Sequence, residues 1–481
     1  MHVKLLQKPS SFLRKRESSV ARLRDKDSCV RYRSRWIPAC AGMTLLFLLG
    51  SFAYAEAAQI QEVTSRGGIK AWLVEDHKLP LVALHFGFRG GVEQDPANKQ
   101  GLANLSMDLL TEGAGNYDAA AFQQKLADHS IQMAFSAGRD SLSGALKTLS
   151  ADRHEAFALL ALALTQPRLD TKDFERERDE QLTGLRSQFG NPDWQARYGL
   201  FQKIFANHPY GQRRLGSIKT LASLTNDDVK AFLASHLARD NLVVAVAGDI
   251  SPSDLATALD QIFGDLPRHA HLTPVGEVEW PQDAATILTP REGTQTELLF
   301  AMSGPKLDDP DWYAAEIANY ILGGGGFSSR LMQDVRDKKG LTYGIDTDIS
   351  PSEHGSLIAG QASTDNPKTK EAWDIALATM RHFYTDGVTQ AEINSAKDYL
   401  TGSLPLSLTS TDKIAALLVS FQIQHRSADY LDKRNDYIRN VTADDVQTAI
   451  RHWFNPDRLT LSMVGKPDGM APTETRALVR E

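Results

Sequence analysis

The sequence predicts an α+β fold of two tandem homologous domains, each a mostly antiparallel or mixed sheet with helices packed on one side. Two observations lead to this prediction. Segments of the chain repeat at a spacing of 217 residues, and in the first half strands come first, helices follow and a strand returns at the end. This order favours antiparallel or mixed sheets over strict alternation of parallel strands and helices.

The clearest repeat is a helix followed by a strand. Residues 225–237 read as a helix and Leu242–Asp249 as an apolar strand, and residues 442–454 and 459–466 follow the same plan. Both helices start with Thr-x-x-Asp, the pattern of a capping box. Both strands are apolar runs that end at a glycine, which is typical of a strand followed by a turn.

A second pair of segments keeps almost the same spacing. Glu155-Ala-Phe157 and Glu371-Ala-Trp373 each open an amphipathic helix, 216 residues apart, and a further helix follows each of them, near residues 173–178 and 390–394. The repeats predict a first domain over residues 59–268 and a second over 269–481, joined near Pro267–Pro274.

The start of the first domain contains its own strands. Residues 71–74 and 81–88 read as strands on either side of Pro80, and residues 100–112 carry apolar positions at helical spacing.

Residues 1–58 predict a leader rather than part of the fold. Residues 1–55 hold 11 Lys or Arg and three acidic residues, and an apolar run of about ten residues from Met43 leads to Ala53-Tyr-Ala55. This order is typical of a secretory signal peptide, so we expect cleavage near Ala55 and an exported, periplasmic protein. The run is too short to cross a bilayer, and no stable membrane span is expected. Because the basic part is long, synthesis from or near Met43 is a further hypothesis.

Composition excludes several classes of protein. Beyond residue 55, the 53 basic and 60 acidic residues of the chain fall to 42 and 57, a net charge of −15 over 426 residues. This balance argues against a nucleic-acid-binding protein. Both cysteines, Cys29 and Cys40, lie in the leader, so the mature chain has no disulfide, cysteine nucleophile or Cys-rich zinc module. The absence of Gly-x-Ser-x-Gly weakens a serine hydrolase.

Three motifs carry a family resemblance. They are Gly101-Leu-Ala, His208-Pro-Tyr-Gly211 and the stretch Ser329-Arg-Leu-Met-Gln-Asp-Val-Arg336-x-x-x-Gly-Leu-x-Tyr343. With the tandem repeat, they resemble the insulinase (pitrilysin, M16) family of metallopeptidases, and in particular its half-length, processing-peptidase-like members. The resemblance covers nearly all of residues 60–467.

The resemblance also identifies what this chain lacks. Catalytic members of the family carry His-x-x-Glu-His on the helix after Gly-Leu-Ala, because histidines at i and i+4 bind zinc on one face while the glutamate activates water. Here the two histidine positions are Asn104 and Asp108, the glutamate position is Met107, and a distal glutamate position falls on Gly184 or its neighbour Thr183. We therefore expect no metal in this chain and no cofactor of its own. An ordinary amphipathic helix accounts for residues 100–112 equally well.

The other half of the family's site is retained. The resemblance assigns to Arg336 and Tyr343 the binding of substrate backbone and the stabilisation of a tetrahedral oxyanion, since both side chains donate hydrogen bonds. A surface arginine beside a core tyrosine is the alternative. Gly323, Gly324, Gly325 and Gly326 resemble a glycine-rich loop that contacts substrate in the non-catalytic subunit of the processing peptidases, and a structural turn is equally expected.

Together these features predict the zinc-less subunit of an exported, heterodimeric metallopeptidase that does not cleave alone. A second family member with the zinc motif would be its partner, and peptides or unfolded polypeptides its substrates. The main alternative is an inactive scaffold or peptide-binding homologue, possibly a homodimer. An active peptidase by itself would need a metal site of another kind, and the 13 histidines show no such spacing.

Overall fold

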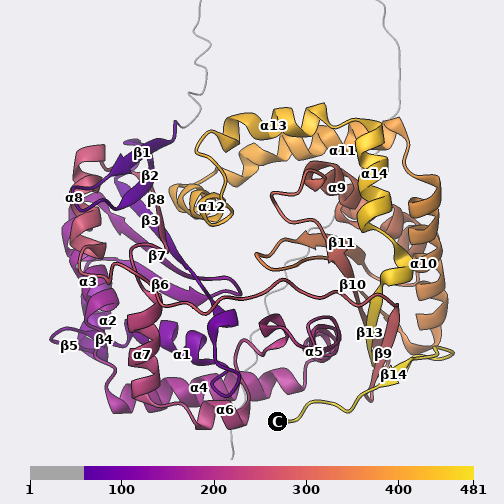
Figure 1. The fold of residues 1–481 in the computed structure, drawn as a ribbon, viewed down its shortest axis with the longest axis horizontal. Helices are drawn as coiled ribbons and strands as arrows, with labels where there is room; N and C mark the ends of the chain where they lie inside the picture. Colours follow the sequence, from indigo (N-terminus) through magenta and orange to yellow (C-terminus); the bar gives the residue numbers. More distant parts are fainter. Residues whose placement is uncertain (1–58) are drawn as a thin grey trace, which may run out of the picture. The chain divides into compact units, whose positions relative to one another are not determined.

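Two six-stranded sheets form the framework of the protein (Figure 1). The structure is a computed structural model and describes residues 59–481. The predicted leader, with its cleavage near Ala55, lies outside the described residues.

The first sheet has the strand order β1-β2-β8-β3-β7-β6. Its strands are β1 (Gln61–Thr64), β2 (Lys70–Glu75), β3 (Leu81–Arg89), β6 (Gln132–Ala137), β7 (Ser141–Leu149) and β8 (Leu242–Gly248). All neighbours are antiparallel except β2 and β8, which run parallel. The strand that returns at the end of the half therefore lies between the two strands on either side of Pro80.

The second sheet repeats this topology. Its order is β11-β12-β10-β13-β9-β14. Its strands are β9 (Ala285–Pro290), β10 (Gln295–Gly304), β11 (Ile345–Ser350), β12 (Ser356–Asp365), β13 (Thr460–Gly465) and β14 (Glu474–Thr475). Strand β13 occupies the place of β8 and is again parallel to one neighbour, β9, and antiparallel to the other, β10. Only the last strand differs, because β14 comes from the end of the chain. The predicted fold class of two homologous mixed sheets is confirmed, whereas the domain boundaries at 268 and 269 stay a prediction.

The helices of the first half are α1 (Leu102–Asp108), α2 (Ala119–Asp128), α3 (Arg153–Thr165), α4 (Thr171–Phe189), α5 (Pro192–Ile204), α6 (Ile218–Ala222), α7 (Asn226–His236) and α8 (Pro252–Phe263). Those of the second half are α9 (Trp312–Asn319), α10 (Thr369–Asp386), α11 (Gln390–Ser403), α12 (Thr411–Ile423), α13 (Tyr430–Asn440) and α14 (Ala443–Trp453). A short hairpin of β4 (Gly113–Ala114) and β5 (Tyr117–Asp118) precedes α2.

The predicted capping boxes are present. Thr225 accepts from the backbone N–H of Asp228 at the start of α7, and Thr442 accepts from that of Asp445 at the start of α14. In both boxes the aspartate in turn accepts from the threonine backbone N–H. The predicted helix over residues 100–112 is shorter than expected, since α1 ends at Asp108 and a 3₁₀ turn follows over Leu109–Thr111.

Each sheet packs its own helices on one face. Alternate residues of β3, from Val82 to Phe88, join the main core of the first half with side chains from α1, α3, α7 and α8. Leu298, Phe300 and Met302 of β10 do the same in the second half with α9, α10 and α14. This one-sided packing follows from the two-residue period of a strand, which sends neighbouring side chains to opposite faces.

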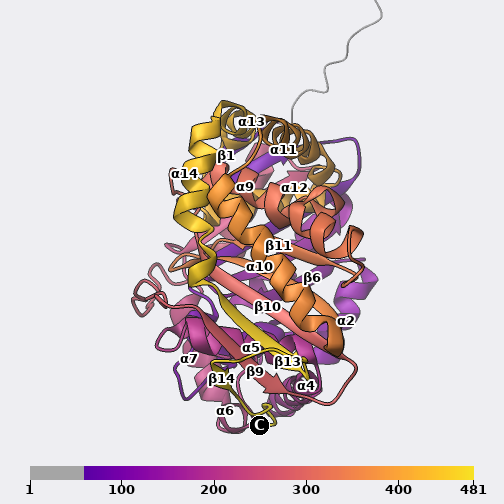
Figure 2. The ribbon, with the colours of Figure 1, turned by 90° about the vertical axis from the view of Figure 1, so that its right-hand side faces the viewer.

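The second face of each sheet is covered by a helix from the other half of the chain (Figures 1 and 2). Helix α12 packs Ala415, Leu418 and Val419 against residues of β3 and β8 such as Ala83 and Ala245. Conversely, α5 packs Ala196, Leu200 and Ile204 against β10 and β13. The halves thus exchange one helix each, a feature that the repeat in the sequence does not predict.

None of the helices found within residues 59–481 combines the length and the apolar character that a membrane crossing requires.

Candidate functional site

Helix α1 is fixed at its start by a glycine and an aspartate. Gly101 has φ +93°, and a Cβ at this position would lie 2.9 Å from the carbonyl oxygen of Leu215. The carboxylate of Asp95 accepts hydrogen bonds from the backbone N–H groups of Gly101 and Ala103, at 2.8 and 2.9 Å. The Gly-Leu-Ala motif is therefore a turn that only glycine fits, and it sets the direction of the helix.

The side chains at the predicted zinc positions are satisfied within α1. Asn104 is 8% exposed and its amide nitrogen donates to the carboxylate of Asp108 at 2.8 Å. Met107 is fully buried in the main core of the first half. Burial raises the pKa of Asp108 to about 6, although the charge of Arg214 acts in the opposite direction.

The predicted distal position lies on α4, which contacts α1. A Cβ at Gly184 would have no atom within 4 Å, so a longer side chain would fit there. The neighbouring Thr183 instead turns its hydroxyl back to the carbonyl oxygen of Asp179 at 2.9 Å. The space for the missing ligand thus remains, but glycine offers no atom to fill it.

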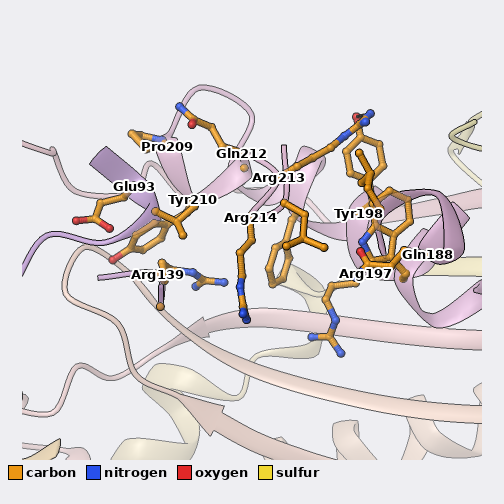
Figure 3. A pocket seen from close by; sticks show the side chains of 17 residues that line it. Glu93, Arg139, Gln188, Arg197, Tyr198, Pro209, Tyr210, Gln212, Arg213 and Arg214 are labelled. Carbon is orange, nitrogen blue, oxygen red and sulfur yellow. Dashed lines mark hydrogen bonds between the residues drawn. The ribbon is translucent and has the colours of Figure 1, made fainter. Parts of the chain in front are cut away.

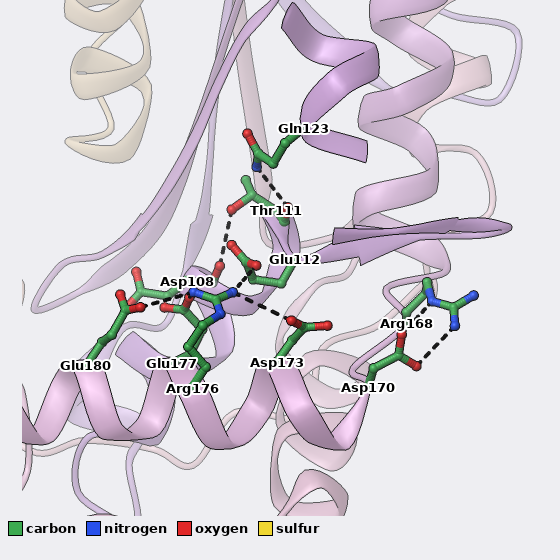
Figure 4. A network of polar contacts seen from close by, with 10 residues as sticks. All are labelled: Asp108, Thr111, Glu112, Gln123, Arg168, Asp170, Asp173, Arg176, Glu177 and Glu180. Carbon is green, nitrogen blue, oxygen red and sulfur yellow. Dashed lines mark hydrogen bonds and ion pairs between the residues drawn. The ribbon is translucent and has the colours of Figure 1, made fainter. Parts of the chain in front are cut away.

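An arginine lies among the acidic residues that face α1 (Figure 4). Arg176 of α4 forms ion pairs with Glu112 and Glu177, reaches Glu180 at 3.1 Å and lies 3.8 Å from Asp173. Its guanidinium supplies the positive charge around which these carboxylates gather.

The residues present do not fit zinc. Asn104 turns its donor nitrogen, not its oxygen, toward Asp108, and Met107 has neither a ligand atom for zinc nor a basic group. In the part of the chain from residue 59 onward, no group of three or more His, Cys, Asp or Glu side chains is placed to hold a metal ion.

Arg336 and Tyr343 lie in the second half, on either side of the turn that ends the π-helical segment η7 (Met332–Asp337). The guanidinium of Arg336 lies 4.5 Å from the ring centre of Phe327, which is itself 64% exposed. Tyr343 is 85% exposed, the largest exposure among the large hydrophobic side chains in residues 59–481. The alternative of a core tyrosine is therefore wrong.

The four glycines differ from one another. Gly323 is buried, and a Cβ there would collide with Thr347, while Cβ atoms at Gly324 and Gly325 would lie 2.8 and 2.7 Å from atoms of Asn319 and Tyr320. Gly326 alone is open, with φ +56° and no atom within 4 Å of a Cβ. Three of the glycines are thus required by close packing, and contact of this segment with substrate stays a prediction.

Sequence reasoning missed a pocket on the first half (Figure 3). Its volume is about 530 Å³. We name it the arginine pocket after its four arginines, Arg139, Arg197, Arg213 and Arg214. It is also lined by Leu185 and Gln188, which follow Gly184 on α4. The only local signal in the sequence is the pair Arg213-Arg214, because the other two arginines come from separate segments.

The family is established by comparison with known proteins. The model for the insulinase family (peptidase family M16) matches residues 71–216, and the model described as the peptidase M16 inactive domain matches residues 223–400. The chain belongs to peptidase family M16, as its motifs indicate.

Individual relatives agree with this assignment. The non-peptidase homolog YmxG of Helicobacter pylori (strain ATCC 700392 / 26695) is 27% identical over 369 residues, which cover 75% of this chain and 84% of the relative. The uncharacterized zinc protease YmxG of Bacillus subtilis (strain 168) is 22% identical, covering 86% of this chain and all of the relative. Among solved structures, a peptidase M16 inactive domain from Pseudomonas fluorescens superposes with a TM-score of 0.80 and 28% identity, over 86% of this chain and 99% of that one.

Proposed function

We propose that this chain is the zinc-less subunit of an exported, periplasmic, heterodimeric M16-type metallopeptidase. In this proposal the chain does not cleave peptides alone, because its own α1 offers neither zinc ligands nor a general base. A second M16 chain that carries His-x-x-Glu-His would bind the zinc ion, and this chain would contribute Arg336 and Tyr343.

The exposure of Tyr343 next to Arg336 is the observation that carries the proposal. A tyrosine that is 85% exposed gives up most of the free energy that burial of its ring would provide. Arg336 is held against Phe327 by a cation–π contact, which restricts the guanidinium without using its hydrogen-bond donors. Both side chains are thus available to a ligand outside the chain.

The chemistry of the pair suits peptide hydrolysis. Zinc in the partner would activate the attacking water and polarise the peptide carbonyl. As the carbonyl oxygen becomes an oxyanion, the Tyr343 hydroxyl can donate a hydrogen bond to it, and the planar fork of Arg336 can hold the neighbouring backbone. Such donors are most effective where the site excludes water, which a second subunit would provide.

Strand β6 offers a place for an extended peptide. It is the edge strand of the first sheet and contacts α1, and its alternate residues Gln132, Ala134 and Ser136 are exposed. An edge strand presents unpaired backbone groups to which a peptide can add as a further strand. This supports peptides or unfolded polypeptides as the ligands.

The second candidate is a catalytically inactive scaffold or peptide-binding homologue, possibly a homodimer. It is favoured by the way Asn104 and Asp108 satisfy each other, since a helix without a catalytic task needs no further partner. This candidate retains the β6 edge but assigns no task to Arg336 and Tyr343.

A mixing experiment separates the two candidates. The purified chain, the zinc-motif M16 homologue encoded with it, and an equimolar mixture would be assayed for zinc-dependent cleavage of an unfolded polypeptide. We expect cleavage only in the mixture, and Tyr343→Phe or Arg336→Lys should lower kcat by about a hundredfold, the range known for loss of one oxyanion donor.

Two controls make the result specific. Tyr437→Phe removes a hydroxyl from another exposed tyrosine of the second half, and Arg451→Gln removes an exposed arginine on α14; neither should change the rate. Cleavage by this chain alone, or mixed activity that ignores Tyr343 and Arg336, would overturn the proposed role. No activity on mixing would favour the scaffold.

A further inference from the structure

The arginine pocket concentrates positive charge in an acidic protein. Its lining includes four arginines and a single carboxyl group, that of Glu93. Burial raises the pKa of Glu93 to about 7, so this group carries only part of a negative charge near neutral pH. The rest of the mature chain, in contrast, is strongly acidic, with 57 acidic and 42 basic residues beyond position 55.

Two of the arginines have no carboxylate partner among residues 59–481. Arg214 forms neither a hydrogen bond nor an ion pair within that range, and Arg139 has one hydrogen bond, to the hydroxyl of Ser352 at 3.3 Å. Arg197 has one ion pair, 3.8 Å from Asp193, with both side chains about half exposed. Arginines in a recess that lack partners can take a ligand with complementary charge.

Aromatic rings hold the most buried of these arginines. The Arg139 guanidinium lies 4.7 Å from the ring centre of Tyr210 and 5.2 Å from that of Phe201. Stacking of this kind fixes the plane of the group and leaves its N–H donors free at the edge. Figure 3 shows the guanidinium groups of Arg139, Arg214 and Arg197 on the same side of the pocket, whereas Arg213 turns toward Tyr198.

The behaviour of Arg213 indicates what the pocket attracts. It donates to the backbone oxygen of Glu481 at 2.7 Å. Next to it, the side chain of Gln195 makes two hydrogen bonds to the backbone of Val479, at 2.8 and 3.0 Å. An extended peptide segment of the chain itself therefore already lies along this rim.

The pocket adjoins the site described above. Leu185 and Gln188 of its lining follow Gly184 on α4, and the charge of Arg214 acts on Asp108. A peptide that lies along α1 would therefore reach the arginines with its next residues.

We propose that the arginine pocket binds carboxylates of a peptide ligand, through forked hydrogen bonds from Arg139, Arg197 and Arg214. The carboxylates can come from acidic side chains or from a free C-terminus, which present the same group to a guanidinium. This inference rests on the proposed peptide-binding function and adds a preference for acidic ligands.

Binding to the chain alone tests the inference, without zinc or partner. Fluorescence anisotropy would compare a labelled peptide containing Glu and Asp with the same peptide carrying Gln and Asn, each with a free or an amidated C-terminus. We expect the acidic peptide to bind at least about tenfold more tightly than its amide counterpart, or the free C-terminus more tightly than the amidated one. The comparison identifies the source of the carboxylate.

Variants localise the effect. Arg214→Gln and Arg197→Gln change exposed side chains, and together they should weaken binding of the preferred peptide by about tenfold or more while leaving its amide counterpart unchanged. Arg139→Gln should have a similar effect, and the exposed pair keeps the test valid if that buried change impairs folding. Arg451→Gln on α14, exposed and outside the pocket, is the matched control and should bind like the wild type.

Equal binding of acidic and amide peptides would overturn the inference, as would a preference that Arg214→Gln and Arg197→Gln leave intact. These outcomes are independent of the mixing experiment. Cleavage on mixing without an acidic preference would remove this inference alone, and carboxylate binding without cleavage would remove only the catalytic role.

Discussion

Asn104 and Asp108 hydrogen-bond to each other across one turn of α1, with the amide nitrogen donating to the carboxylate at 2.8 Å. These are the two positions at which the M16 resemblance expects zinc-binding histidines. Their mutual bond satisfies polar groups that would otherwise be left unpaired in a largely buried place, so the helix is stable without metal.

Rebuilding the ligand set should restore metal binding. The combination Asn104→His, Met107→Glu, Asp108→His and Gly184→Glu places histidines at i and i+4 and fills the open space at Gly184, so we expect one zinc ion per chain by metal analysis after dialysis. The matched control carries Thr183→Glu with Gly184 unchanged, which turns the carboxylate about 100° around α4. Equal zinc content in both variants would contradict the placement of Gly184.

Stability should depend on pH through Asp108. Its pKa is raised from 3.8 to about 6 by burial, so the folded state favours the protonated form. The stability contributed by that proton is present at low pH and is lost as the pH rises from about 4 through 6. Asp108→Asn stays neutral, and by pH 8 it should be more stable than the wild type by about 2 kcal/mol, with no difference near pH 4. Urea unfolding at several pH values measures this, and a difference that is constant across the range would refute it.

Loss of Arg176 should destabilise the protein. Arg176→Gln leaves Glu112, Glu177 and Glu180 facing one another without their shared cation, and like charges at this spacing repel. Because the arginine is 40% exposed, solvent screens the effect, and we expect a loss of about 1 kcal/mol that shrinks in high salt. Arg186→Gln, on the exposed last turn of α4, is the control. If both variants unfold at the same denaturant concentration, the network contributes nothing.

The exchanged helix α12 should stabilise the sheet of the other half. Leu418 is fully buried against the first sheet, and Leu418→Ala should cost about 3 kcal/mol, in the range for buried leucines. Amide hydrogen exchange should speed up in β3 and β8, more than 150 residues away in the chain. Lys413→Ala, on an exposed position of the same helix, should leave these strands protected. Faster exchange confined to the second half would contradict the coupling.

Much of the fold was accessible from the sequence because its signals are local. The Thr225 and Thr442 capping boxes, and the apolar strands that follow, are written in short contiguous segments and recur at one spacing. The replacement of His-x-x-Glu-His could be recognised for the same reason, since Asn104, Met107 and Asp108 lie on one helical turn.

What escaped prediction depends on distant contacts. The apolar stripe of α12 shows that Leu418 is buried, but not that β3 and β8 of the first half bury it. The exposure of Tyr343 likewise follows from the turn after η7, not from its neighbours in sequence. The arginine pocket draws Arg139 and Arg197 from a loop and a helix that no periodicity connects.

The exchange of α5 and α12 has a consequence for how the chain acquires its structure. His85 on β3 meets Asp412 on α12 across a separation of 327 residues, so the contact closes a very long loop. Closing such loops slows folding, and the apolar face formed by Ala83 and Ala245 stays open until most of the polypeptide has been made. The first half is therefore expected to depend on a chaperone during synthesis, and a fragment that ends between the halves should aggregate rather than fold.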